Sequence, residues 1–106
     1  MRRQSRAIGY VRRDLRESEL DLSVLAGRHG YRIVYTVVAD TRPVISGLVV
    51  AQHLHEYEAD AVVVPGFEHA EKIRSLITEL AVLITPRQVY PHGYRWPDPV
   101  TEGGPR

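Results

Sequence analysis

Arginine and aspartate residues that follow apolar segments are the side chains best suited to chemistry in this chain. Arg12, Arg13 and Asp14 close the first apolar segment, and Asp40 and Arg42 follow the next one. Guanidinium groups beside a helix start could bind an anion, because the helix dipole and its free N–H groups favour negative charge. The two aspartates would neutralise much of that charge, so a salt-bridge cluster and an anion site carry equal weight here.

Asp14 has three interpretations: a general base, a metal ligand or a helix cap. Its spacing to Glu17 is that of a D-x-x-E capping box, in which each side chain satisfies a free backbone N–H. The helix would end before Gly30, because glycine is common just beyond a helix terminus. We therefore favour the cap for Asp14 over a role in catalysis or metal binding.

Other patterns point away from a metal or a cofactor. His53 and His55 are two apart on a predicted helix and face different directions, so they cannot chelate one ion together. Glu68 and His69 are adjacent, but no further ligands follow at a recognisable spacing, and the chain has no cysteine. Ser46 lacks a G-x-S-x-G setting, and neither a Walker loop nor G-x-G-x-x-G is present. We expect no metal and no cofactor.

Aromatic and amphipathic residues alternate near the end of the chain, at Tyr90, His92, Tyr94 and Trp96. Alternation is typical of one face of an edge strand. Tyrosine and tryptophan are also enriched in protein interfaces. Both interpretations stay open, and the segment is the best candidate from the sequence for contact with a partner.

Strand and helix patterns alternate along the chain. The predicted strands are 6–12, 31–38, 61–64 and 81–84, with 89–90 as a short addition at the edge. The predicted helices are 14–29, 46–57 with Ser46 as its cap, and 68–80. This order predicts an α/β fold of three layers (α/β/α), with a mainly parallel sheet of four to five strands.

The candidate residues should meet at the carboxyl ends of the parallel strands, where such sheets hold their functional crevice. Four segments would form that rim: Arg12–Asp14, Asp40–Arg42, Pro65–His69 and Thr85–Arg87. We assign 1–96 to a single domain and the Pro- and Gly-rich end, 97–106, to a disordered tail.

Charge and hydropathy limit the classes of partner. The 106 residues include 14 Lys and Arg against 13 Asp and Glu, so the net charge of +1 gives no general attraction to nucleic acid. Only Arg2, Arg3 and Arg6 concentrate positive charge, and a solvated terminus is the preferred interpretation of them. No apolar run approaches the roughly 20 residues of a membrane helix, and no signal peptide is recognised. We expect no membrane association and a cytoplasmic location.

Three segments resemble the catalytic domain of the serine recombinases, the resolvases and invertases. They read RAIGYVRRD from Arg6, LAGRHGYRIVYTVVAD from Leu25 and ISGLVVAQHLHEYEADAVVVPGFEHAEKI from Ile45. The resemblance implies a resolvase-like domain with flavodoxin-like winding. It also implies that Tyr10 and Arg12 occupy the positions of a tyrosine and an arginine that line the family's active site.

The chain departs from that family where recombination needs it most. Asp14 occupies the position of the nucleophilic serine, and its carboxylate would be repelled by a DNA phosphate. The segment 66–71 carries Glu68 and Glu71 where the family has arginines that stabilise the phosphoryl transition state. The family's long helix, which makes dimer and DNA contacts, is not found after the last strand. We therefore expect no catalytic residues and no recombinase activity.

The leading hypothesis is a non-catalytic resolvase-like domain that acts through protein–protein association, as a homodimer or as an accessory or regulatory subunit. The alternative is a DNA-associated regulatory protein that binds without cleavage, and the third hypothesis is a small-anion binder or an enzyme at the strand rim. Candidate contacts to DNA or an anion are Arg2, Arg3, Arg6, Arg12, Arg13 and Arg42. Candidate interface residues are Tyr90, Tyr94 and Trp96.

Overall fold

A five-stranded sheet with the order β2-β1-β3-β4-β5 forms the centre of the computed structural model, which describes residues 5–15, 21–39 and 42–97. The strands are β1 (Ser5–Arg12), β2 (Tyr31–Ala39), β3 (Ala61–Val63), β4 (Val82–Ile84) and β5 (Val89–Tyr90). The first four are mutually parallel, and β5 pairs antiparallel with β4. The predicted mainly parallel sheet is confirmed, as is the short edge strand at 89–90.

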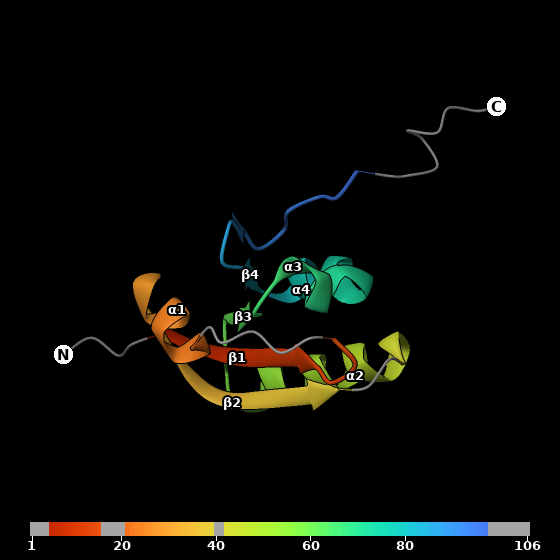
Figure 1. Ribbon diagram of the computed structural model, residues 1–106, viewed down its shortest axis with the longest axis horizontal. Helices are drawn as coiled ribbons and strands as arrows, with labels where there is room; N and C mark the ends of the chain where they lie inside the picture. Colours follow the sequence, from red (N-terminus) through yellow and green to blue (C-terminus); the bar gives the residue numbers. More distant parts are fainter. Residues whose placement is uncertain (1–4, 16–20, 40–41, 98–106) are drawn as a thin grey trace.

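Helices cover both faces of this sheet. They are α1 (Leu22–Arg28), α2 (Pro43–Glu56), α3 (Phe67–Ala70), the 3₁₀ helix η1 (Glu71–Ile73) and α4 (Arg74–Leu80). In Figure 1 the long strands β1 and β2 lie side by side, with α1 and α2 on different sides of them. The three-layer α/β/α fold predicted from the sequence is thus confirmed. No helix within the described ranges has the length and apolarity that crossing a membrane requires.

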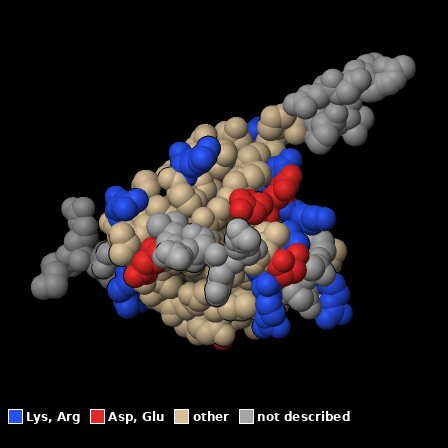
Figure 2. Space-filling view, viewed as in Figure 1, with Lys and Arg blue, Asp and Glu red and all other residues tan. Residues whose placement is uncertain are grey.

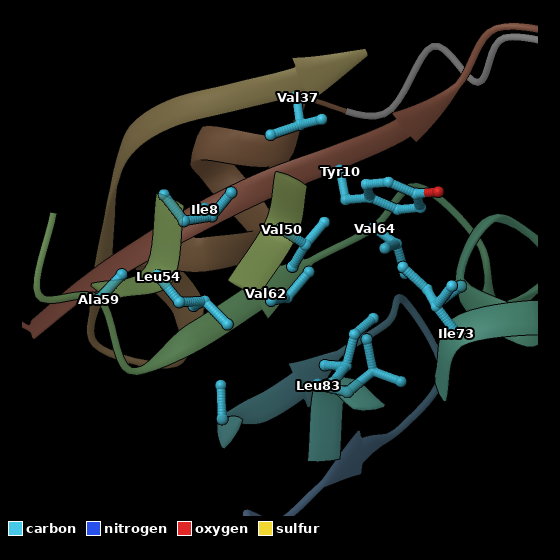
Figure 3. Packing of buried hydrophobic residues seen from close by; sticks show 13 residues of the cluster. Ile8, Tyr10, Val37, Val50, Leu54, Ala59, Val62, Val64, Ile73 and Leu83 are labelled. Carbon is cyan, nitrogen blue, oxygen red and sulfur yellow. The ribbon is translucent and has the colours of Figure 1, made fainter. Parts of the chain in front are cut away.

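The core is divided by the sheet into two clusters. Strand β3 is buried on both faces: Val62 points toward α2, whereas Ala61 and Val63 point toward α1, and all three are fully buried. Such two-sided burial is expected of a central parallel strand. Figure 3 shows Val50 and Leu54 of α2 packed over the sheet in the larger cluster.

The first helix begins later than predicted. Its cap is Asp21, whose carboxylate accepts the N–H of Ser23 at 2.9 Å. The predicted cap at Asp14 is wrong, because this residue lies in a turn after β1 and its carboxylate accepts hydrogen bonds from Arg12 instead. Glu17, the other half of the predicted capping box, lies outside the described residues.

The predicted cap of the second helix is also wrong, by about one turn. Helix α2 starts at Pro43 with Arg42 in the cap position, and Ser46 lies inside the helix with 3% of its surface exposed. Proline suits a first helical position, because its fixed φ is helical and no N–H is needed there. The predicted helix 68–80 is present in three pieces, with η1 between α3 and α4. From residue 98 on, the predicted tail lies outside the described residues.

Two glycines are needed for the close fit of these elements. A Cβ on Gly9 would lie 2.8 Å from Thr36 Oγ1 and 3.2 Å from Leu22 Cδ1, so a side chain there would displace the side chains that pack on this position. Gly30 has a φ of +83°, which turns the chain from α1 into β2 and which other residues rarely adopt. Both positions therefore require glycine for a steric or conformational reason.

Candidate functional site

The carboxyl ends of β1, β3 and β4 form one rim, as expected for parallel strands. Arg12 pairs with Ala39 in the β1–β2 register, and Val63 pairs with Ile84 in the β3–β4 register. The N–H of Arg13 continues the first pairing by donating to the Ala39 carbonyl at 2.7 Å. Arg12–Asp14, 65–69 and 85–87 thus leave the sheet at the same edge.

Arg12 and Asp14 form a two-point ion pair at this rim. The Arg12 Nε lies 3.0 Å from Asp14 Oδ1, and Nη2 lies 2.5 Å from Oδ2. The hydrogen bonds from Arg12 hold the pKa of the Asp14 carboxyl below its ordinary value. The carboxylate matches the guanidinium charge, so this arginine offers little net attraction to an outside anion.

His69 links α3 to the end of β1. Its side chain is 2% exposed, and its Nδ1 accepts the backbone N–H of Arg12 at 3.0 Å. An accepting Nδ1 places the proton of the neutral ring on Nε2. Burial lowers the pKa of His69, which keeps the ring neutral near pH 7. His69 therefore acts as a structural bridge that the sequence pattern did not reveal.

Tyr10 and Arg6 do not join Arg12 and Asp14 at this rim. Tyr10 is 2% exposed and belongs to the larger core cluster (Figure 3). Arg6 lies near the start of β1, about 20 Å from Arg12 at the strand rise of about 3.3 Å per residue, and its Nη1 donates to the Tyr57 carbonyl at 2.9 Å. Arg2 and Arg3 lie outside the described residues. On the face drawn in Figure 2, basic side chains are spread around the molecule with acidic ones among them.

The aromatic residues near the chain end pack on the protein itself. Tyr90, Tyr94 and Trp96 contact one another with ring centroids 4.6–5.2 Å apart, and Tyr90 and Trp96 also contact Phe67. Trp96 Nε1 donates to Thr78 Oγ1 at 2.9 Å. Only the first of the alternating residues belongs to a strand, since β5 ends at Tyr90. Much of this aromatic surface is therefore used to attach the segment to α3 and α4.

A crevice of about 760 Å³ lies beside the rim, lined by 65–68, 85–88 and Tyr90. Its charged residues, Glu68 and Arg87, have opposite signs. Within residues 5–15, 21–39 and 42–97, no three His, Cys, Asp or Glu side chains gather as metal ligands would. The crevice shows no nucleophile paired with a base.

An apolar surface stands out on α2. Val44, Ile45 and Leu48 are 76%, 50% and 66% exposed, although all three are large aliphatic residues. Beside them a groove of about 430 Å³ separates α2 from η1 and α4. We call these three residues and the groove the α2 face. The groove is lined by Val44, Gly47, Leu48, Lys72, Ile73, Ser75 and Leu76.

The amino-acid composition of α2 indicates an unusually apolar helix, but the spacing of its apolar residues does not show which of them are exposed. The segment 43–55 contains no Asp, Glu, Lys or Arg. A helix that is apolar all round is normally buried on all sides, yet α2 has the sheet on one side only. Covered and uncovered apolar residues become distinguishable once the neighbouring elements are placed.

The chain was compared with protein-family models, with curated proteins and with solved structures, and none of the three comparisons gives a match.

Proposed function

We propose that this chain is a non-catalytic, resolvase-like domain that acts in the cytoplasm through protein–protein association. The observation that carries the proposal is the α2 face, where Val44, Ile45 and Leu48 are at least half exposed. The largest contiguous apolar patch on the surface of a monomeric protein is often its interaction site. Association would remove these side chains from water, at roughly 25 cal/mol for each Å² of apolar surface buried.

The rim supports the non-catalytic part of the proposal. Asp14 stands where the resembled family has its serine, and its carboxylate is held by Arg12 in a two-point pair. His69 is buried and has its Nδ1 engaged by a backbone N–H, so this nitrogen is not available to take a proton from a nucleophile. Each of these three polar residues thus has a structural partner that accounts for its position.

The association surface that we propose differs from the one favoured by the sequence. Trp96 is hydrogen-bonded to Thr78 and stacked against its neighbours, so partner contact there would compete with intramolecular contacts. Val44 and Leu48, in contrast, give their outer surfaces to solvent. The α2 face is therefore the better surface for a partner, whereas Tyr90, Tyr94 and Trp96 serve first to fix the end of the domain.

The test compares wild type with Leu48→Arg and with a matched control, Val24→Arg. Val24 is 50% exposed on α1, on the other side of the sheet from α2. Self-association, or capture of a partner, should be lost in Leu48→Arg and kept in Val24→Arg. A wild type that stays monomeric at high concentration and captures nothing beyond what Leu48→Arg captures would refute the proposal.

Wild type and Leu48→Arg, together with Arg13→Ala, also test the DNA-binding alternative. Retention of a DNA fragment in a gel at low salt, unchanged in Leu48→Arg and lost in Arg13→Ala, would favour that alternative, because phosphate contacts depend on basic side chains and weaken steeply with salt.

A further inference from the structure

We propose that the α2 face binds a second copy of this chain, in a two-fold pair where Val44 and Leu48 of each copy enter the groove of the other. This inference rests on the proposed function and names the partner of the same surface.

The shape of the α2 face is self-complementary. Val44 and Leu48 project at the edge of the groove, while Gly47 lies in it with its backbone buried. A Cβ on Gly47 would lie 2.8 Å from Leu76 Cδ2, so the glycine lets the Leu76 side chain pack directly against α2. Both residues line the groove, which is the depression of the patch. In a two-fold interface both copies use the same patch, so the patch must carry both the side chains that project and the groove that receives them.

The groove has the volume for the side chains that would enter it. Its volume is about 430 Å³, whereas a cavity of about 150 Å³ is enough to hold a benzene molecule. Two aliphatic side chains therefore fit. Ile73 and Leu76 would then contact the partner's Leu48, which places apolar atoms on both sides of the contact.

The charge distribution favours a second copy over an oppositely charged protein. In a two-fold pair a charged group near the axis faces its own duplicate and is repelled by it, and segment 43–55 contains no Asp, Glu, Lys or Arg. Lys72 is the charged residue among those lining the groove, and it is exposed. Its long aliphatic stem allows the ammonium group to remain in water at the edge of the pair.

The area of the α2 face limits the size of the interface that the pair can form. The 14 residues of α2 span about 21 Å at the helical rise, and a neighbouring helix at about 8–10 Å widens the surface to roughly 20 Å. The flat footprint is thus about 400 Å² per copy, below the roughly 800 Å² of a stable standard interface. We therefore expect a reversible dimer with a Kd in the micromolar range.

Analytical ultracentrifugation over a concentration series tests the pair. Wild type and Val24→Arg should pass from monomer to dimer in the micromolar range, whereas Leu48→Arg should remain monomeric, a loss of at least about 100-fold in affinity. Far-UV circular dichroism checks that each variant is folded. A dimer that persists in Leu48→Arg would overturn the inference and leave association by another surface standing.

A wild type that is monomeric throughout the series would also overturn the inference. The proposed function would still stand if wild type captured a partner that Leu48→Arg does not capture. Failure of the two-fold pair can therefore be told apart from failure of the proposed function.

Cross-linking gives a second measurement that does not depend on a disruptive charge. The chain has no cysteine, so Leu48→Cys and Val24→Cys each introduce one thiol into an otherwise unreactive background. A short bis-maleimide linker should give a covalent dimer of Leu48→Cys and leave Val24→Cys monomeric. Equal yields from the two variants would overturn the inference.

Discussion

Removal of the Thr78 hydroxyl should release the aromatic segment from α4. Thr78 is 1% exposed, and its Oγ1 accepts the Trp96 Nε1–H at 2.9 Å. Its single proton can be donated to the Tyr94 carbonyl at 3.1 Å or to the Arg74 carbonyl at 3.2 Å. Thr78→Val keeps the shape of the side chain and removes both interactions. The backbone bond from the Gly93 N–H to the Thr78 carbonyl, at 2.6 Å, is not removed by this change.

The expected loss is about 2 kcal/mol, because each hydrogen bond contributes about 1 kcal/mol net. For a domain of this size, 1 kcal/mol corresponds to a change in Tm of roughly 4–8 °C, so Thr78→Val should melt about 10 °C below wild type. Trp96→Phe removes one of the two bonds and should cost about half as much. The double variant should cost less than the sum of the two single variants, because they share one interaction.

The assay uses the fact that Trp96 is the only tryptophan in the chain. Its fluorescence reports on the aromatic segment alone, whereas far-UV circular dichroism reports on the whole fold. In Thr78→Val we expect a red-shifted emission before denaturation and a lower urea midpoint, by about 1 M for an m-value of roughly 1–3 kcal/mol/M.

The matched control is Thr36→Val, a change of the same chemistry at an exposed position of β2. Its effect on the free energy of unfolding should stay within about 0.5 kcal/mol. If Thr78→Val had the emission and the midpoint of wild type, the assigned role of the hydroxyl would be wrong.

Three further predictions concern stability. Burial lowers the pKa of His69 below its ordinary value of 6.5, so the unfolded chain is protonated at higher pH than the folded one. Stability should therefore fall as the pH drops below about 6.5. The amide oxygen of His69→Asn can accept the Arg12 N–H, and this variant should lose less stability between neutral and acidic pH in thermal melts. A loss equal to that of wild type would show that His69 is not the cause. Gly27→Ala, in α1 where an added Cβ meets nothing within 4 Å, should raise stability by about 0.5–1 kcal/mol. Gly30→Ala, at positive φ, should lower stability by about 1 kcal/mol, and urea unfolding would contradict the reasoning if both changes had the same sign. Leu83→Ala, at a fully buried site, should cost about 2–5 kcal/mol in the same assay, and a loss below 1 kcal/mol would show that the core is looser than its burial indicates.

The strands were predictable because their signals are local. Ala61–Val63 is a continuous apolar run bounded by turn residues, and the sheet buries it from both faces. Helix starts were less predictable because several residues compete to be the cap. Asp14 and Asp21 are the same residue type, and the turn after β1 gives the first of them a partner in Arg12.

The candidate site was only partly predictable, for a physical reason. The sequence placed Arg12 and Asp14 at the strand rim, and these residues are close neighbours in the chain. The contact between Arg12 and His69 spans 57 positions and depends on how α3 packs against β1. Leu48 illustrates the same limit, because an apolar residue on a helix is covered or exposed only according to which elements lie beside it.

The unequal division of the core has a consequence for the motions of the domain. Over the described ranges, the cluster on the α1 side of the sheet has six buried residues, two of them from α1 itself, against thirteen in the cluster on the side of α2 and α4. Helix α1 has seven residues, and isolated helices that short are unstable in water. Its amide hydrogens should therefore exchange with solvent through local opening, well before those of β1 and β3. Opening of this layer would leave the packing between α2 and the sheet in place.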